Sequence, residues 1–257
     1  MANMNYTGER IIPDAPECLP GTLIYETHVA RYHFALPFAR GKTVLDLACG
    51  VGYGSRLLAE NGALRVIGGD ISRDAIAYAR ERFADRHTVY SVMSAADIPI
   101  PSSSVDLVVS FETVEHVPDG NRFLEEINRV LRVDGALIIS TPNRDTYGTA
   151  RDVPDNEFHT REYTITEFRN LLSRFFQRIE LFSQRRLIRQ SRLAALTDAM
   201  MRRLRFADKL GLRKILVPKG VRSLVGRATD AYDRDCRVSP LRADDSPLFF
   251  VAVGQRT

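Results

Sequence analysis

Glu112, Glu115 and His116 have the types and spacing that suit proton transfer or metal binding. On a helical turn, positions i, i+3 and i+4 lie on one side, so we expect the three groups to face the same way. A histidine beside a carboxylate can take a proton from a hydroxyl. Two carboxylates and a histidine can instead bind a divalent metal that lowers the pKa of that hydroxyl. A third interpretation is structural, with the same residues closing a turn, and the residues alone leave all three open.

A turn of small residues earlier in the chain could bind a cofactor. In VLDLACGVGYG, an apolar strand runs into Gly50 and Gly52 and then into a helix. Small residues let a ligand approach the backbone, and the start of a helix offers free N–H groups. Asp46 lies inside the strand, and an acid there suits a cationic ligand group rather than a pyrophosphate. The GxGxG spacing also lacks the third glycine of the dinucleotide pattern.

Asp70 ends the next apolar segment, VIGGD, twenty residues after Gly50. A carboxylate at the tip of a strand can accept hydrogen bonds from both hydroxyls of a ribose. The alternative is that Asp70 only caps the following helix. Because the acid accompanies the glycine turn, we favour ribose binding.

Strand and helix patterns alternate along the chain, and they must position these residues. Strands are expected at 43–48, 64–69, 87–92, 105–110, 136–141, 178–182 and 248–254, and helices at 25–39, 54–60, 73–84 and 166–176. A further helix begins at the cap Asp119 and is ended by Gly135. This alternation predicts a doubly wound α/β sheet with one core. Ligands bind such sheets at the carboxyl ends of the strands, where all the residues above would lie.

The charge of the chain is uneven. Lys and Arg (36) exceed Asp and Glu (32) by +4, but residues 178–227 hold fourteen basic and three acidic side chains, a balance of +11. We expect a single domain over 1–257, with a leader and covering helix at 1–39 and a basic, mostly helical insertion at 185–246 before the last strand. The insertion is either a solvated face or a surface for an anionic acceptor, an anionic membrane leaflet or nucleic acid.

Composition argues against several classes of protein. No apolar run approaches the roughly 20 residues of a membrane-spanning helix, and the N-terminal residues lack the apolar core of a signal peptide. Three cysteines without CxxC spacing argue against a disulfide framework or a zinc finger. We therefore expect a cytoplasmic protein, with peripheral contact at the inner membrane face as the option that the basic insertion adds.

Four blocks, VLDLACGVGYG, VIGGDIS, FETVEHVPD and LIISTPN, resemble the class I S-adenosylmethionine-dependent methyltransferases in order and spacing. The resemblance implies a Rossmann-like seven-stranded sheet whose last strand is antiparallel, and S-adenosylmethionine as the cofactor. The motif that holds the methionine part of the cofactor matches Asp46, Ala48, Gly50 and Gly52. Asp70 matches the ribose-binding acid.

The same resemblance implies further cofactor contacts. Ile71 would pack on the adenine. Ser94 stands where the family often has an aspartate for the adenine amine, so the backbone N–H of Ala95 would serve instead. Phe111 follows the fourth strand, where the backbone meets the methionine amine. Arg31, on the covering helix, is our candidate for the carboxylate of the cofactor.

The ExxEH pattern is similar to that of metal-dependent small-RNA 2′-O-methyltransferases and ubiquinone-pathway O-methyltransferases. It implies Mg²⁺ or Mn²⁺ held by Glu112, Glu115, His116 and a later histidine, His159. Without a metal, the catalytic residues would be His116 as general base, Glu115 as the group that orients it, and His159.

The segments TGERIIPD and TPNR…NEFHTREY look like those of bacterial methyltransferases that act on sugar hydroxyls, including lipid-linked and cell-envelope glycans. They suggest that Asn143, Arg144, His159, Thr160 and Arg161 lie near the acceptor. We therefore expect O-methylation of a carbohydrate, with a glycan or glycolipid acceptor as partner and a possible homodimer.

Two other functions remain as alternatives. One is an RNA 2′-O-methyltransferase that holds phosphates on the basic insertion. Nucleic acid is disfavoured, because residues 178–227 contain only two aromatic residues, Phe182 and Phe206, and single-strand binding needs several stacking platforms. The other is a non-catalytic cofactor-binding scaffold, against which stand the intact acids and histidine of ExxEH.

Overall fold

A computed structural model describes residues 11–12, 20–147, 156, 158–186 and 235–257 of the chain. Most of the leader and residues 187–234 lie outside this part. The helical structure of the basic insertion therefore stays a prediction. Eleven of the fourteen basic side chains in 178–227 lie outside the described residues. Among the described residues, no helix combines the length and the apolar character that crossing a bilayer requires.

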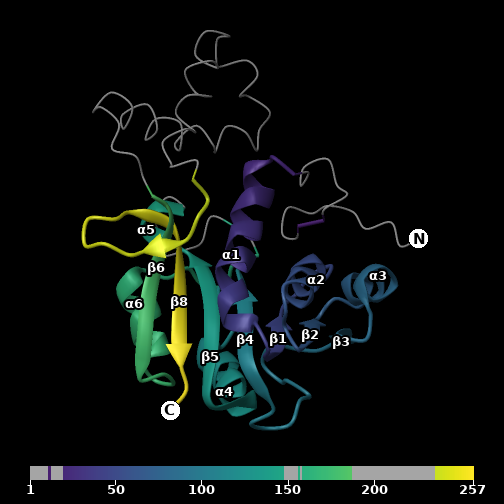
Figure 1. Cartoon of the computed structure of the whole chain (residues 1–257). Helices are drawn as coiled ribbons and strands as arrows, with labels where there is room; N and C mark the ends of the chain where they lie inside the picture. Colours follow the sequence, from purple (N-terminus) through teal and green to yellow (C-terminus); the bar gives the residue numbers. More distant parts are fainter. Residues whose placement is uncertain (1–10, 13–19, 148–155, 157, 187–234) are drawn as a thin grey trace.

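The fold is built on one twisted sheet of eight strands, in the order β3-β2-β1-β4-β5-β8-β6-β7 (Figure 1). The strands are β1 Thr43–Leu47, β2 Arg65–Asp70, β3 Thr88–Val92, β4 Val105–Phe111, β5 Leu131–Pro142, β6 Arg178–Arg186, β7 Ser239–Pro240 and β8 Pro247–Gln255. β1 to β5 are parallel, and β8 runs antiparallel to its neighbours β5 and β6. The predicted doubly wound sheet and its antiparallel last strand are confirmed. The two-residue strand β7, paired with β6, is one strand more than predicted.

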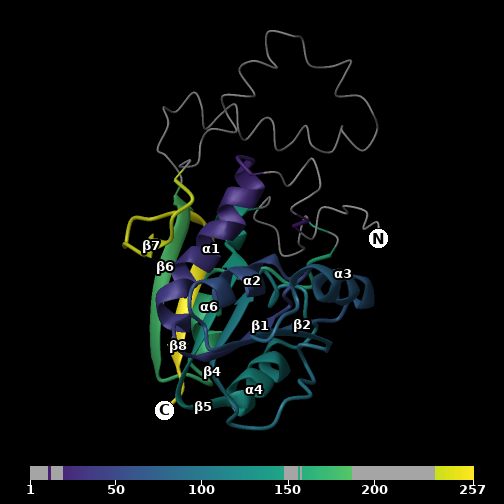
Figure 2. The same ribbon diagram turned by 45° about the vertical axis from the view of Figure 1, so that its right-hand side comes forward.

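Helices cover both faces of the sheet, as Figures 1 and 2 show. They are α1 Leu23–Ala39, α2 Tyr53–Glu60, α3 Arg73–Phe83, α4 Gly120–Val130, α5 Arg144–Tyr147 and α6 Ile165–Leu172. Asp119 caps α4 as predicted, since its carboxylate accepts from the N–H groups of Asn121 and Arg122. The prediction that Gly135 ends this helix is wrong. Leu131 already pairs with Val105 of β4, so β5 begins there and Gly135 lies within it.

The core has two layers because neighbouring residues of a strand point to opposite faces. Val44 packs with α1 and α2, while Leu45 packs with α4 and α6. In β5, Ile138 faces the first layer and Ile139 the second. The central strands are therefore apolar on both sides, as buried parallel strands are. This rigid sheet holds the loops at its carboxyl edge.

Candidate functional site

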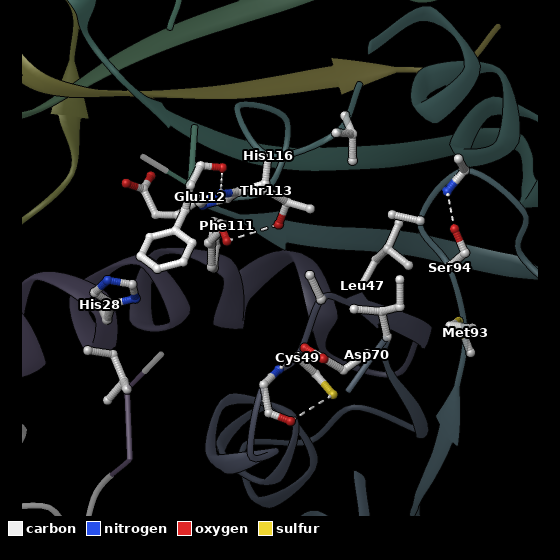
Figure 3. Close-up of a pocket in the computed structure, with 18 of the residues that line it drawn as sticks. His28, Leu47, Cys49, Asp70, Met93, Ser94, Phe111, Glu112, Thr113 and His116 are labelled. Atoms are coloured by element: carbon white, nitrogen blue, oxygen red, sulfur yellow. Dashed lines mark hydrogen bonds between the residues drawn. The ribbon is translucent and has the colours of Figure 1, made fainter. Parts of the chain in front are cut away.

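A cavity of about 540 Å³ opens at the carboxyl edge of the sheet, between the turn after β1 and the turn after β4 (Figure 3). The predicted residues that line it are Ala48, Gly50, Asp70, Ile71, Ser94, Ala95, Phe111, Glu112 and His116. The structure thus brings together residues from four loops that are far apart in sequence. Such a largely apolar cavity with a few polar groups is the usual form of a small-molecule site.

The turn after β1 has the backbone conformation that favours small residues. Ala48, Gly50 and Gly52 have φ angles of 62°, 56° and 85°. A Cβ at Gly52 would lie 2.6 Å from the ring of Tyr90 and 2.8 Å from Cβ of Ala79. Gly52 therefore lets α2 begin close to α3 and β3, but it does not line the cavity. Its role is to shape the turn rather than to touch a ligand.

Asp70 is placed as a ribose-binding acid requires. Its two carboxylate oxygens accept from the N–H groups of Gly50 (2.9 Å) and Ser72 (2.8 Å), so the side chain is fixed at the tip of β2. A carboxylate has about four lone-pair sites, so it can accept more than two hydrogen bonds. Helix capping is not the role of Asp70, because Ser72 caps α3. Beside Asp70, Ile71 is 74% exposed and offers an apolar surface at the mouth of the cavity.

Asp46 lies outside the cavity, contrary to its predicted contact with a ligand. The alternation of β1 turns Asp46 to the same face as Val44, toward α1 and α2. There its carboxylate accepts from the hydroxyls of Ser55 (2.6 Å) and Tyr32 (3.2 Å). Burial raises the pKa of Asp46 to about 7. Asp46 therefore supports the turn by fastening both helices under it.

Arg31 also differs from its prediction. It is completely buried, stacks 4.4 Å from the centre of the Phe249 ring, and donates to Oε1 of Gln184 (2.8 Å). One of its terminal nitrogens lies 3.3 Å from the carboxylate of Glu112. Glu112 lines the cavity and Arg31 does not, so Arg31 stands behind the wall rather than in it.

α1 and α2 turn toward the cavity aromatic and imidazole groups that were not among the predicted site residues. His28 and Tyr32, four residues apart on α1, both line it, as does Tyr53 at the start of α2. Tyr32 packs edge-on against Tyr53 and Phe111, with ring centres 5.6 and 5.1 Å apart. Burial and the nearby Arg31 charge lower the pKa of His28 to about 3, so His28 is neutral at pH 7. The i, i+4 spacing of His28 and Tyr32 in the sequence indicates that both side chains lie on one face of α1.

The residues of the ExxEH pattern lie on a tight turn after β4, not on a helix. Glu112 has a φ of 50° and accepts from the hydroxyl of Ser140 (2.7 Å), which turns it toward Arg31. The expectation that all three residues face one side is therefore wrong. Glu112 and His116 line the cavity, whereas Glu115 is fully buried behind it.

His116 is oriented for a role as a base. Its Nδ1 lies 2.9 Å from the carbonyl oxygen of Phe158, so in the neutral ring Nδ1 carries the proton and Nε2 the lone pair. The predicted orienting group, Glu115, instead accepts from the hydroxyl of Thr141 (3.1 Å). Burial and the neighbouring Glu112 raise the pKa of Glu115 well above its ordinary value.

His159 packs edge-on against His116, with ring centres 4.8 Å apart. Its Nδ1 lies 2.9 Å from the carboxylate of Glu162, and its Nε2 lies 3.0 Å from the amide of Asn156. Both ring nitrogens are therefore engaged, and His159 supports the wall behind His116.

The donor atoms of Glu115, His116 and His159 lie within 4.8 Å of one another, so three of the four predicted metal ligands gather. The four-ligand site does not assemble, however. Glu112 is outside this group and bound to Arg31, and both nitrogens of His159 already have partners. One carboxylate oxygen of Glu115 is buried without a hydrogen-bond partner, and the predicted Mg²⁺ or Mn²⁺ site stays a prediction.

None of the five residues predicted near the acceptor lines the cavity. Thr160 donates to the carbonyl oxygens of Glu115 (2.9 Å) and Val117 (3.0 Å), which fastens its loop to the turn after β4. Asn143 is buried and holds the carbonyl of Pro247. Arg144 and Arg161 pair with Glu167 on α6 instead of entering the cavity. Phe158, which was not predicted, lines it.

Comparison with known proteins agrees with the fold and the motifs. The family described as a methyltransferase domain matches residues 45–139. A probable S-adenosylmethionine-dependent methyltransferase of Mycobacterium tuberculosis is 39% identical over 171 residues, which are 66% of this chain and 60% of that protein. A ubiquinone biosynthesis O-methyltransferase of Coxiella burnetii is 34% identical over 109 residues, 41% of this chain and 46% of that protein.

A solved structure shares the fold. It is an S-adenosylmethionine-dependent methyltransferase, described as a possible histamine N-methyltransferase, from Thermotoga maritima, with a TM-score of 0.59 at 15% identity. The match covers 91% of each chain. Against the mycobacterial relatives, the chain spans about 60% of their length.

Proposed function

Residues 45–139 match the methyltransferase domain family, and from this premise we propose that the protein is an S-adenosylmethionine-dependent O-methyltransferase acting on a hydroxyl of a sugar, glycan or glycolipid. The observation that carries the proposal is one cavity with two chemically different ends. Asp70 and Ile71 lie at one end, and Glu112, Thr113 and His116 lie at the other.

The first end fits the cofactor. Asp70 would accept the two ribose hydroxyls, and Ile71 would cover the adenine. Ala95 would offer its backbone N–H to the adenine edge, beside Ser94. The rings of Tyr32, Tyr53 and Phe111 would surround the positive sulfur, because aromatic faces attract cations. When bound, the cofactor supplies an activated methyl group.

The second end fits a hydroxyl acceptor. His116 would hold the acceptor hydroxyl through Nε2 and take its proton, while the carbonyl of Phe158 holds the ring in place. A positioned base contributes about 10²–10⁴-fold. Aligning the acceptor with the methyl group contributes more, up to about 7–11 kcal/mol.

The walls of this end suit a sugar. Val117, Pro118 and the ring of Phe158 form an apolar side, which matches the C–H face of a pyranose. Glu112 and Thr113 form a polar side that would bind neighbouring hydroxyls. The relative described as an O-methyltransferase supports oxygen as the acceptor atom.

The test is methyl transfer from labelled S-adenosylmethionine to a glycolipid extract, measured for the wild-type protein and for His116→Gln. We expect at least a 100-fold loss of turnover with cofactor affinity unchanged. His87→Gln changes a half-buried histidine just before β3 that does not line the cavity; it is the matched control and should keep full activity. If turnover persists in His116→Gln, the proposal that His116 acts as the general base is wrong.

Metal assistance and RNA methylation are tested in the same assay. Because both nitrogens of His159 are engaged, we expect EDTA to leave the activity unchanged. A loss on chelation that Mg²⁺ or Mn²⁺ restores would instead support the metal. If RNA is added and the labelled methyl group appears in RNA rather than in glycolipid, the result would favour the RNA alternative.

A further inference from the structure

A second pocket lies next to the acceptor end of the main cavity, and we propose that it binds a phosphate-type oxyanion carried by the acceptor. It has a volume of about 240 Å³ and lies between the start of α4, the loop before α6 and α6 itself. Its lining includes Gly120, Asn121, Arg161, Tyr163, Glu167 and Arg174. The inference rests on the proposed function, because it concerns the acceptor of that reaction.

The hydroxyl of Tyr163 can donate to a ligand in the second pocket. Tyr163 is only 4% exposed as a residue, but it lines this pocket, and no protein partner of its hydroxyl is found within the described part of the chain. A Cβ at position 120 would lie 3.1 Å from this hydroxyl, so Gly120 keeps it open to the pocket. An anionic oxygen in the pocket would accept from it.

The charges around the pocket favour an anion. Arg161 lies over the ring of Tyr163 at 5.1 Å and pairs with Glu167 at 3.2 Å. Glu167 is also paired with Arg144 at 3.3 Å, so two guanidinium groups offset its charge. Arg174 donates to the amide oxygen of Asn121, a neutral acceptor, at 2.9 Å. Guanidinium forks match the geometry of phosphate oxygens.

Two further acids, Glu115 and Asp119, also act on Tyr163. Asp119 precedes the pocket, and its carboxylate accepts from two N–H groups at the start of α4. Its charge is thereby partly offset by the helix dipole.

The second pocket is joined to the catalytic turn. The backbone N–H of Arg161 donates to the carbonyl of Glu115 at 3.2 Å, next to the bonds made by Thr160. Val117 lines the main cavity, and Gly120 lines the second pocket three residues later. An acceptor with its phosphate in the second pocket would therefore hold a nearby sugar hydroxyl toward His116.

The experiment is an NMR titration of the full-length protein with inorganic diphosphate at constant ionic strength, with sodium chloride as the matched series. We expect saturable shifts of the Nε–H signals of Arg161 and Arg174 and of the Tyr163 ring. Arg174→Gln and Tyr163→Phe should each weaken binding at least fivefold. Arg65→Gln, an exposed arginine at the start of β2, is the control and should not.

Shifts that match those with chloride, or that survive Arg174→Gln unchanged, would show an adventitious ion only and overturn the inference. A parallel titration with S-adenosylmethionine separates the two proposals. Cofactor binding without diphosphate binding at Arg174 overturns this inference alone. Failure of cofactor binding would overturn the proposed function first.

Discussion

At the scale of single residues, the end of the cavity that we propose for the cofactor depends on a glycine that leaves room for its neighbours. Gly52 never touches the cavity, yet it allows the turn that places Gly50 against the carboxylate of Asp70. The hydroxyl of Tyr90 closes this arrangement by donating to the carbonyl of Gly52 at 3.0 Å. A side chain at position 52 would have no room beside that ring.

Gly52→Ala should therefore lower the free energy of unfolding by roughly 2–4 kcal/mol, from the positive φ and from overpacking against Tyr90. Gly41→Ala is the matched control, because Gly41 has a φ of 70° but a methyl group added there would meet nothing within 4 Å. It should lose only about 1 kcal/mol. Urea unfolding of both variants measures the difference, and equal losses would contradict the packing argument.

The residue scale also shows what sequence reasoning missed. Asp70, Ile71 and Ser94 follow strand tips, and their placement could be predicted because all parallel strands end at one edge. Arg31 and Asp46 could not be placed, because their directions depend on which buried partner each finds across the fold. Phe158 and Ile11 also line the cavity, but they lie in irregular segments. Such segments have no repeating pattern of apolar residues from which the direction of a side chain can be predicted.

At the scale of elements, α4 holds the loop after β3 in place through one carboxylate. Glu126 accepts from the N–H of Ile98 (2.9 Å) and pairs with Arg129 (2.8 Å). Arg129 in turn donates to the carbonyls of Ile98 and Ile100. This network fixes the segment that follows Ser94 and Ala95, so it supports the end of the cavity that we propose for the adenine.

Glu126 should make stability depend on pH. The hydrogen bond from Arg129 lowers the pKa of Glu126 to about 2, below its value in the unfolded chain. Stabilisation is therefore complete above about pH 4.5 and is lost as the pH falls toward 2. Glu126→Gln should cost on the order of 2 kcal/mol at pH 7, and less at pH 3.

Chemical unfolding across this pH range measures the effect. Glu125→Gln serves as control, since this exposed neighbour lies 3.7 Å from Arg122 and should change stability by less than about 0.5 kcal/mol. A cost for Glu126→Gln that stays constant down to pH 3 would contradict the pKa assignment.

At the scale of the whole molecule, the two ends of the basic segment meet on the sheet. Gln184 near the end of β6 donates to the carbonyls of Thr27 on α1 and of Cys236. Arg186 and Asp235 line one small pocket, although 48 residues separate them in the sequence. The described strands therefore form a continuous sheet without residues 187–234. The predicted insertion, 185–246, overlaps the end of β6 and all of β7.

Replacing residues 187–234 with a short Gly-Ser linker should leave the fold and the cofactor affinity within about twofold, because the linker joins ends that already lie together. Transfer to the glycolipid acceptor should fall strongly, since the replaced segment carries eleven of the fourteen basic side chains in 178–227. Comparing calorimetric cofactor binding with acceptor turnover checks both parts. Full turnover in this variant would make the basic segment incidental.

The central claim is that Asp70 and the turn beside it bind the nucleoside of S-adenosylmethionine. Calorimetric titration of the wild-type protein and of Asp70→Asn tests it, with Asp74→Asn as an exposed control and NAD as a competing ligand. We predict one S-adenosylmethionine per chain, about 10-fold or more weaker binding in Asp70→Asn, from loss of a hydrogen bond to a charged group, and no binding of NAD. Unchanged affinity in Asp70→Asn, or binding of NAD instead, would contradict the account.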